Sequence, residues 1–147
     1  MSHANPSDQE LEALLTSSTT IAIVGASSNP EKASHGIMQK LQRAGYRVIP
    51  VNPRESEVLG ERSYPSLIDV PERIDIVDVF RRAEDAPAIA DEAVTIGAKA
   101  LWLQTGIVSE EAAARARAGG LMVVMDACIG ATHARLRIPL KTKLTAR

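Results

Sequence analysis

Residues 20–30 read Thr-Ile-Ala-Ile-Val-Gly-Ala-Ser-Ser-Asn-Pro, an apolar run that breaks abruptly into small and hydroxyl-bearing residues. Continuous Val, Ile and Ala runs are typical of buried parallel strands. A following turn of Gly, Ala and Ser lets backbone N–H groups approach a phosphate at the start of the next helix. The stretch therefore predicts a first strand at about residues 20–25 that leads into a phosphate-binding turn.

The same alternation of apolar runs and helical segments continues along the chain. We expect four further strands, at about residues 46–51, 74–80, 100–104 and 121–126. We expect four helices, at about residues 7–16, 34–44, 86–96 and 109–118, and one short helix near Ser66 in the irregular connection 54–73. Right-handed crossovers place helices on both faces of such a sheet. The prediction is a three-layer, doubly wound, Rossmann-like α/β domain of about five parallel strands in the order 3-2-1-4-5.

Composition argues against several classes of protein. The 147 residues suffice for one domain over 1–147, with a helix at 7–16 before the sheet and a short basic tail at about 137–147. A net charge of −1 and 3% aromatic residues disfavour nucleic acids and anionic membranes as partners. No apolar run is long enough to span a membrane, and the single cysteine, Cys128, leaves no internal disulfide or zinc-type cluster. We expect a soluble cytoplasmic protein without a metal site, as a monomer or a homodimer.

A ligand is expected at the carboxyl ends of the strands, because open α/β sheets bind ligands in the crevice there. The residues that this rule selects are Gly25, Ala26, Ser27, Ser28, Asn52, Pro53, Arg54, Phe80, Arg81, Gln104, Gly106 and Cys128, and the loop into the first crossover helix adds Lys32, Ser34 and His35. Adjacent arginines are usually solvated surface residues. Of Arg81 and Arg82 we therefore expect one, Arg81, to contribute.

Two features narrow the choice of nucleotide. A dinucleotide fingerprint needs Gly-x-Gly-x-x-Gly after the first strand, whereas Gly25 is followed by Ala26 and the next glycine is Gly36. The second strand ends in Asn52-Pro53-Arg54 rather than in an acid that would bind free ribose hydroxyls. The missing acid and Arg54 favour a ribose that carries a phosphate, because a guanidinium group matches phosphate oxygens. NADP and coenzyme A both remain possible.

Several motifs in order resemble one known family. They are Val24 to Ser27, Ile49 to Pro53, Leu59-Gly60, Asp75 to Arg81, Leu101 to Gln104 with Gly106, and Asp126 with Cys128. The chain resembles, over about residues 19–136, the single-domain CoA-binding protein family, which is related to the CoA-binding N-terminal domain of the succinyl-CoA synthetase alpha subunit. The resemblance implies that the nucleotide part of CoA lies near Gly25, Ala26, Ser27, Lys32, Asn52, Pro53 and the end of the third strand. It implies no established reaction, because the further domains with which the synthetases catalyse find no room in this chain.

The chain departs from similar proteins after the last strand, where they often carry Asp-Arg-Cys and then Glu-His. Ala127 and Thr132 stand at the positions of that Arg and Glu. Asp126, Cys128 and His133 are close in sequence, but no oxyanion site or metal set accompanies them. We therefore give this trio no catalytic role.

We expect a non-catalytic, or catalytically uncharacterised, protein that holds the 3′-phospho-ADP part of CoA or acyl-CoA at the strand ends. Two alternatives stay open: an NADP-binding oxidoreductase-like domain, and a regulatory or protein-interaction domain with a vestigial nucleotide site. The expected partner is a small-molecule CoA ligand, with no nucleic acid and no membrane. Any acyl group and any protein partner stay open.

Overall fold

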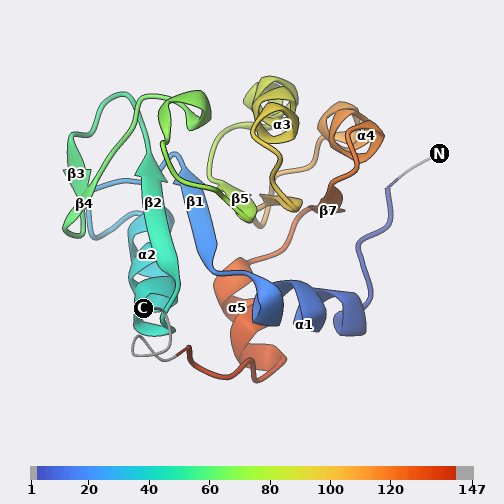
Figure 1. The fold of residues 1–147 in the computed structure, drawn as a ribbon, viewed down its shortest axis with the longest axis horizontal. Coiled ribbons are helices and arrows are strands. Elements are labelled where there is room, and N and C mark those ends of the chain that lie inside the picture. The colour runs from blue at the N-terminus through green and yellow to red at the C-terminus, as the bar shows by residue number, and fades with distance from the viewer. Residues whose placement is uncertain (1–2, 142–147) are drawn as a thin grey trace.

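The computed structural model describes residues 3–141 and shows one parallel sheet between two layers of helices (Figure 1). The sheet strands are β1 (Thr20–Val24), β2 (Arg47–Val51), β5 (Ile76–Val79), β6 (Ala100–Leu103) and β7 (Met122–Val124). The α-helices are α1 (Asp8–Ser17), α2 (Ala33–Arg43), α3 (Ala86–Thr95), α4 (Glu110–Ala118) and α5 (Ile129–Arg135). A small hairpin of β3 (Glu57–Val58) and β4 (Glu61–Arg62) and two short 3-10 turns, η1 (Leu67–Asp69) and η2 (Ala83–Asp85), complete the described chain. The predicted doubly wound, Rossmann-like α/β class is confirmed.

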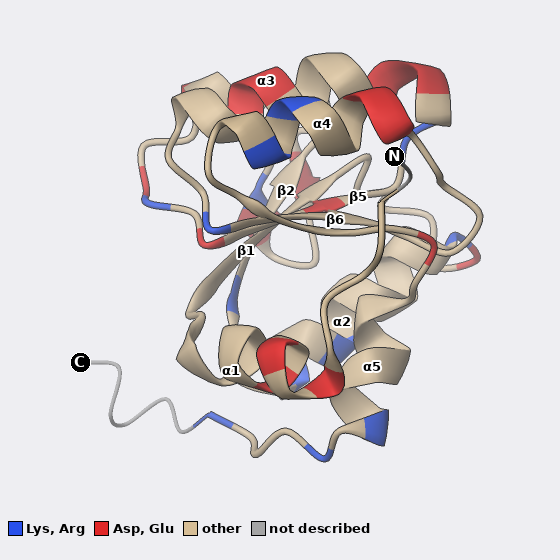
Figure 2. Ribbon diagram, turned by 90° about the vertical axis from the view of Figure 1, so that its right-hand side faces the viewer, with Lys and Arg blue, Asp and Glu red and all other residues tan. Residues whose placement is uncertain are grey.

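The sheet is buried on both faces because successive side chains of a strand point to opposite layers. In β1, Ala22 and Val24 pack in the core cluster that includes α3 and α4, whereas Ile21 and Ile23 pack in the cluster that includes α1, α2 and α5. Figure 2 shows these two helical layers above and below the sheet. Burial on both faces explains why the strands are continuous apolar runs in the sequence.

The predicted N-terminal helix is present and begins at its expected cap. The Ser7 side chain accepts a hydrogen bond from the Glu10 N–H, and the Glu10 carboxylate accepts one from the Ser7 N–H. This reciprocal capping box satisfies two N–H groups that a helix start leaves without a partner. Between residues 3 and 141 no helix is both long and apolar enough to cross a membrane.

The strand order differs from the prediction in the position of one strand. The observed order is β2-β1-β5-β6-β7, which is 2-1-3-4-5 when the sheet strands are numbered along the chain. The outer edge of β2 is partly occupied, because Tyr64 pairs with it through its N–H to Pro50 O (3.1 Å) and its O to Asn52 N–H (2.8 Å). β5 lies instead between β1 and β6, with all its residues buried. The direction of winding therefore reverses between β1 and β5.

Helix α5 was not predicted. The sequence Ile-Gly-Ala-Thr-His-Ala-Arg contains a glycine and two β-branched residues within seven positions, which gives it a low helical propensity. Packing compensates, since a Cβ on Gly130 would lie only 2.9 Å from Ile37 Cδ1 of α2. The two departures from similar proteins have local partners here: Trp102 Nε1 donates to Ala127 O (2.9 Å), and Thr132 Oγ1 donates to Cys128 O (2.9 Å).

Candidate functional site

The turn after β1 lies at the reversal point of the sheet, where ligands bind in doubly wound folds. Gly25 has a φ of +92°, and its N–H donates to Val51 O at 2.8 Å. A Cβ at this position would lie 2.8 Å from Phe80 O and 3.1 Å from Arg81 Cδ. Glycine is required both for the left-handed backbone and for the close approach of the end of β5.

The loop from this turn into α2 carries the predicted hydroxyl and basic residues. His35 Nδ1 lies 2.9 Å from Ser27 O, so the imidazole is hydrogen-bonded to the turn. Lys32 is the N-cap residue of α2 without a side-chain capping bond, and Ser34 is buried in the first helical turn. The first N–H groups of a helix have no intrahelical partner and favour an anion. The loop therefore presents a helix start, a hydroxyl group and an ammonium group together.

Two side chains from the turn after β2 reach the turn after β1. Asn52 Nδ2 donates to Ala26 O (2.7 Å), and Asn52 Oδ1 accepts from the Arg54 N–H (2.9 Å). Ser28 donates through both its N–H (2.8 Å) and its Oγ–H (3.0 Å) to the Glu55 carboxylate. Asn52 is therefore a clamp between the turns, and its amide is already engaged.

The first three residues after the second strand, Asn52 to Arg54, include no acid, but the fourth residue is acidic. Glu55, one residue further, returns toward the site because its N–H donates to Asn52 O (3.2 Å) and closes a tight turn. Its carboxylate then lies against the β1 turn, as the Ser28 hydrogen bonds show. Arg54 is thus the one residue after the second strand that still favours a phosphorylated ribose. The pair Asn52-Pro53 is typical of a turn, and such a turn directs the residues that follow it back toward the end of the strand.

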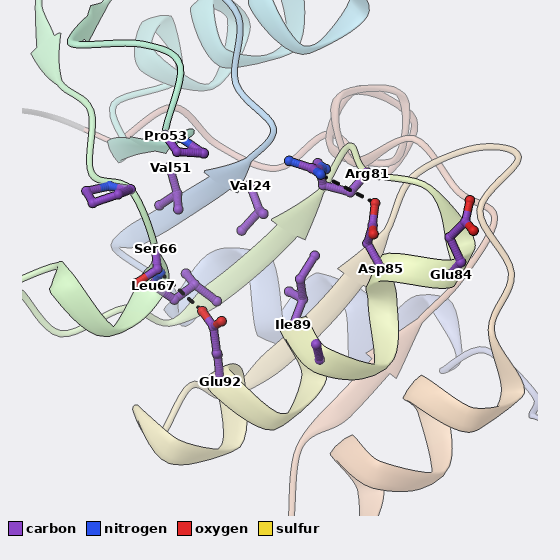
Figure 3. Close-up of a pocket in the computed structure, with 12 residues that line it drawn as sticks. Val24, Val51, Pro53, Ser66, Leu67, Arg81, Glu84, Asp85, Ile89 and Glu92 are labelled. Carbon is purple, nitrogen blue, oxygen red and sulfur yellow. Dashed lines mark hydrogen bonds and ion pairs between the residues drawn. The ribbon is translucent and has the colours of Figure 1, made fainter.

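A cavity of about 300 Å³ lies beside these turns, between η1 and α3 (Figure 3). Its apolar lining residues are Val24, Val51, Pro53, Pro65, Leu67, Ala88 and Ile89. Its polar lining residues are Ser66, Arg81, Glu84, Asp85 and Glu92, and the Glu92 carboxylate accepts a hydrogen bond from the Leu67 N–H at 3.3 Å. Among the residues predicted for the site, Pro53 and Arg81 line this cavity. The other lining residues were not predicted: Val24 and Val51 end β1 and β2, and the rest come from the irregular 54–73 connection, η2 and one face of α3, where no sequence pattern marks a pocket.

The basic residues at this edge of the sheet differ in their partners. Arg54 and Lys32 are exposed, and neither side chain has a hydrogen bond or ion pair with any residue in the described range. Arg81 lines the cavity, with its Nη2 3.5 Å from Asp85 Oδ2. Arg82 is 73% exposed, contacts Glu84 and Asp85, and does not line the cavity. Of the two adjacent arginines, the geometry favours Arg81.

Gln104 is buried and oriented by an aspartic acid that the sequence analysis did not select. Gln104 Nε2 donates to Asp78 Oδ1 at 2.5 Å, and Asp78 Oδ2 is buried without a hydrogen-bond partner. Burial raises the pKa of Asp78 well above its usual range, and the bond from Gln104 opposes this shift only in part. Burial in the middle of the sheet therefore favours the protonated form of Asp78 more than exposure to solvent would.

This buried acid predicts a pH dependence of stability. The folded pKa of Asp78 exceeds the unfolded value of 3.8, so the folded protein keeps a proton that the unfolded chain releases. The contribution of Asp78 to the free energy of unfolding should be largest below that unfolded value and should fall with rising pH until the folded pKa is passed, by up to about 1.4 kcal/mol per pH unit. In urea titrations between about pH 4 and pH 8, Asp78→Asn should lack this fall, whereas the exposed control Asp69→Asn should retain it. Parallel profiles for wild type and Asp78→Asn would contradict the assignment.

The turns after β6 and β7 are hydrogen-bonded to each other, and their residues do not line the cavity. The Gly106 N–H donates to Asp126 Oδ1 (2.7 Å), and Asp126 has a φ of +53°. Cys128 caps α5, with its Sγ accepting from the Ala131 N–H at 3.4 Å. His133 packs edge-on against the Tyr46 ring, with ring centroids 5.8 Å apart, and burial lowers its pKa. Asp126, Cys128 and His133 thus have separate partners, and the geometry does not assemble them into a catalytic set.

The remaining predicted residue, Phe80, links the end of β5 to the turn. Its N–H donates to Val24 O (2.8 Å), and its half-buried ring packs against the cluster that includes α2. The turns after β1, β2 and β5 therefore form one structure around Gly25. The fold is therefore a Rossmann-like domain with a cavity beside the turns at its reversal point.

The chain belongs to the CoA-binding domain family, whose family model, CoA binding domain, matches residues 19–134. It is 43% identical over 130 residues to YneT, an uncharacterised protein of Bacillus subtilis strain 168, which covers 88% of this chain and 96% of that protein. A hypothetical protein of Pyrococcus horikoshii OT3 with a solved structure has a TM-score of 0.88 and 36% identity over 93% of this chain and 99% of its own. The family expected from the sequence motifs is confirmed.

Larger enzymes contain a related domain. The match to the ADP-forming acetate–CoA ligase II of Archaeoglobus fulgidus is 29% identical over 94 residues, which is 63% of this chain but 14% of the ligase. The chain therefore corresponds to a small part of that enzyme. The similarity supports a shared CoA-binding domain rather than a shared reaction.

Proposed function

We propose that this protein binds CoA or acyl-CoA through its 3′-phospho-ADP part, at the carboxyl ends of β1, β2 and β5, as a cytoplasmic binding protein with no assigned reaction. The observation that carries the proposal is the cavity between η1 and α3, which opens beside the turn around Gly25. Family membership supports CoA as the ligand. The single cysteine, which is free, fits a reducing compartment.

The cavity suits the adenine ring. Val51, Leu67 and Ile89 offer apolar surface for the two faces of a planar base. Glu84, Asp85 and Glu92 supply carboxylate oxygens, which accept hydrogen bonds from the exocyclic amine of adenine and would repel a phosphate. The adenine end is therefore assigned to the cavity and the phosphates to the turns.

The phosphates find their donors around the start of α2. The diphosphate is assigned to the Ser27 to Ser34 loop with Lys32, because N–H, hydroxyl and ammonium groups all stabilise an anion there. Arg54 extends from the neighbouring turn without a partner of its own among the described residues. It is the candidate for the 3′-phosphate, since guanidinium groups bind phosphate oxygens through parallel hydrogen bonds.

Titration calorimetry with CoA, 3′-dephospho-CoA, NADP and NAD tests the assignment. We expect CoA to bind best and dephospho-CoA about tenfold more weakly, which is the loss of one exposed charge-assisted contact. Arg54→Ala should erase most of that difference, whereas Arg43→Ala, an exposed arginine at the other end of α2, should preserve it. Equal affinities for CoA and dephospho-CoA in the wild type would refute the role of Arg54.

The same titration separates the alternative functions. Tight binding of NADP without binding of CoA would instead support an oxidoreductase-like domain. Binding of none of the four ligands would support a regulatory domain with a vestigial site. Either result would overturn the proposed function.

A further inference from the structure

The turn after β1 already holds an anion that belongs to the protein. Ser28 donates two hydrogen bonds to the same oxygen, Glu55 Oε2, one from its backbone N–H at 2.8 Å and one from its hydroxyl at 3.0 Å. Within the described chain, Ser28 is the only hydrogen-bond partner of the Glu55 carboxylate, and no Lys or Arg pairs with it. The acid is therefore held at this turn by the turn's own donors.

A carboxylate and a phosphate bind the same hydrogen-bond donors of such a turn. Both are acceptor-only groups with a negative charge, and both form short charge-assisted hydrogen bonds with N–H and O–H donors. Ser28 offers its N–H once and its hydroxyl proton once. A phosphate oxygen that takes these two donors must therefore displace Glu55, and a phosphate beside an undisplaced Glu55 meets a like charge.

We propose that Glu55 is an internal competitor for the phosphate-binding turn, which occupies Ser28 in the free protein and leaves when a ligand phosphate arrives. This inference rests on the proposed function for the identity of the ligand. If Glu55 has left Ser28 in only a fraction of the unliganded molecules, the apparent affinity of every phosphate ligand falls by that fraction. This loss of apparent affinity is the same for each ligand whose phosphate reaches Ser28, and it is zero for a ligand without a phosphate.

The neighbouring clamp makes this displacement local. Asn52 holds the same two turns together through its bond to Ala26 O (2.7 Å), which involves no charge. The Glu55 side chain can therefore rotate away while the backbone turn from Asn52 to Glu55 stays closed. For the same reason, variants at Glu55 should fold as the wild type does.

The test compares Glu55→Gln and Glu55→Ala with the wild type and with Glu57→Gln. Glu57 is an exposed acid two residues away whose side chain has no hydrogen-bond partner in the described chain, so it reproduces the change in charge without touching Ser28. Calorimetry with CoA and ADP should show about three- to tenfold tighter binding for both Glu55 variants, by a similar factor for the two ligands. Adenosine, followed by NMR titration, should bind all four proteins equally, and Glu57→Gln should match the wild type throughout.

Two further measurements do not depend on CoA. Inorganic pyrophosphate should also bind the Glu55 variants more tightly than the wild type, and the Ser28 amide resonance of the free protein should move upfield when the carboxylate is removed. If no protein binds CoA but pyrophosphate and the amide resonance respond, the proposed function fails and the inference on Glu55 stands. Unchanged or weaker pyrophosphate and CoA binding in both Glu55 variants would overturn the inference, and weaker binding would show that Glu55 contacts the ligand instead.

Discussion

Replacing Ala88 with Trp should weaken CoA binding by at least about 100-fold, or about 2.7 kcal/mol of binding free energy. Ala88 is exposed on α3 and lines the cavity of about 300 Å³. An indole ring there fills the space that the proposed adenine site requires, and it adds no atoms to the core. The free energy of unfolding should change by less than about 1 kcal/mol, because Trp is only slightly less favourable than Ala on an exposed helix face.

Ala114→Trp is the matched control for this substitution. Ala114 is likewise an exposed alanine within a helix, α4, and it does not line the cavity between η1 and α3. It should bind CoA as the wild type does, with a similar small change in stability. Calorimetry and urea unfolding of both variants supply the comparison. Wild-type CoA affinity in Ala88→Trp would place the adenine ring elsewhere, and an equal loss in both variants would show that the effect is unrelated to the cavity.

The fold could be read from the sequence because its elements are strongly patterned. The strands are buried on both faces, and a helix such as α1 begins at a capping box that the letters show directly. Strand order is a long-range property that no local pattern encodes. Here Tyr64 pairs with the outer edge of β2, and β5 lies on the other side of β1. Pro50 in β2 fits an edge position, since proline lacks an N–H, and β2 is at the edge.

The candidate site was predictable only where backbone chemistry determines it. The turn at Gly25 and the strand ends follow from the fold, whereas side chains that change the chemistry arrive through tertiary contacts. Glu55 reaches Ser28 because an Asn-Pro turn folds back, and Asp78 looks like an ordinary strand residue until its complete burial is known. Asn52, which the sequence assigns to the ligand, also donates a hydrogen bond to Ala26 O. Hydrogen bonding between distant segments decides these roles, and one sequence does not display it.

Two glycines near the proposed phosphate site should respond in opposite directions to the same substitution. Gly25→Ala should lower the free energy of unfolding by about 2–3 kcal/mol, because φ is +92° and the new methyl group meets Phe80 O at 2.8 Å. The Phe80 backbone cannot easily move away from this methyl group, because its N–H donates a hydrogen bond to Val24 O. Gly36→Ala should instead stabilise the protein by about 0.5–1 kcal/mol, because Gly36 lies within α2 and a Cβ there meets nothing within 4 Å.

This contrast also bears on ligand class, because the third glycine of a dinucleotide fingerprint allows close packing of helix against strand. Open space at Gly36 shows that it has no such role, in agreement with the failed fingerprint in the sequence. Gly25→Ala should weaken CoA binding at least about tenfold by shifting the turn and Arg81, whereas Gly36→Ala should bind CoA as the wild type does. Urea unfolding and calorimetry measure both effects. A Gly25→Ala protein with wild-type stability and affinity would contradict both predictions. It would mean that the end of β5 can move away from the new methyl group without loss of stability, and that the turn does not position the ligand.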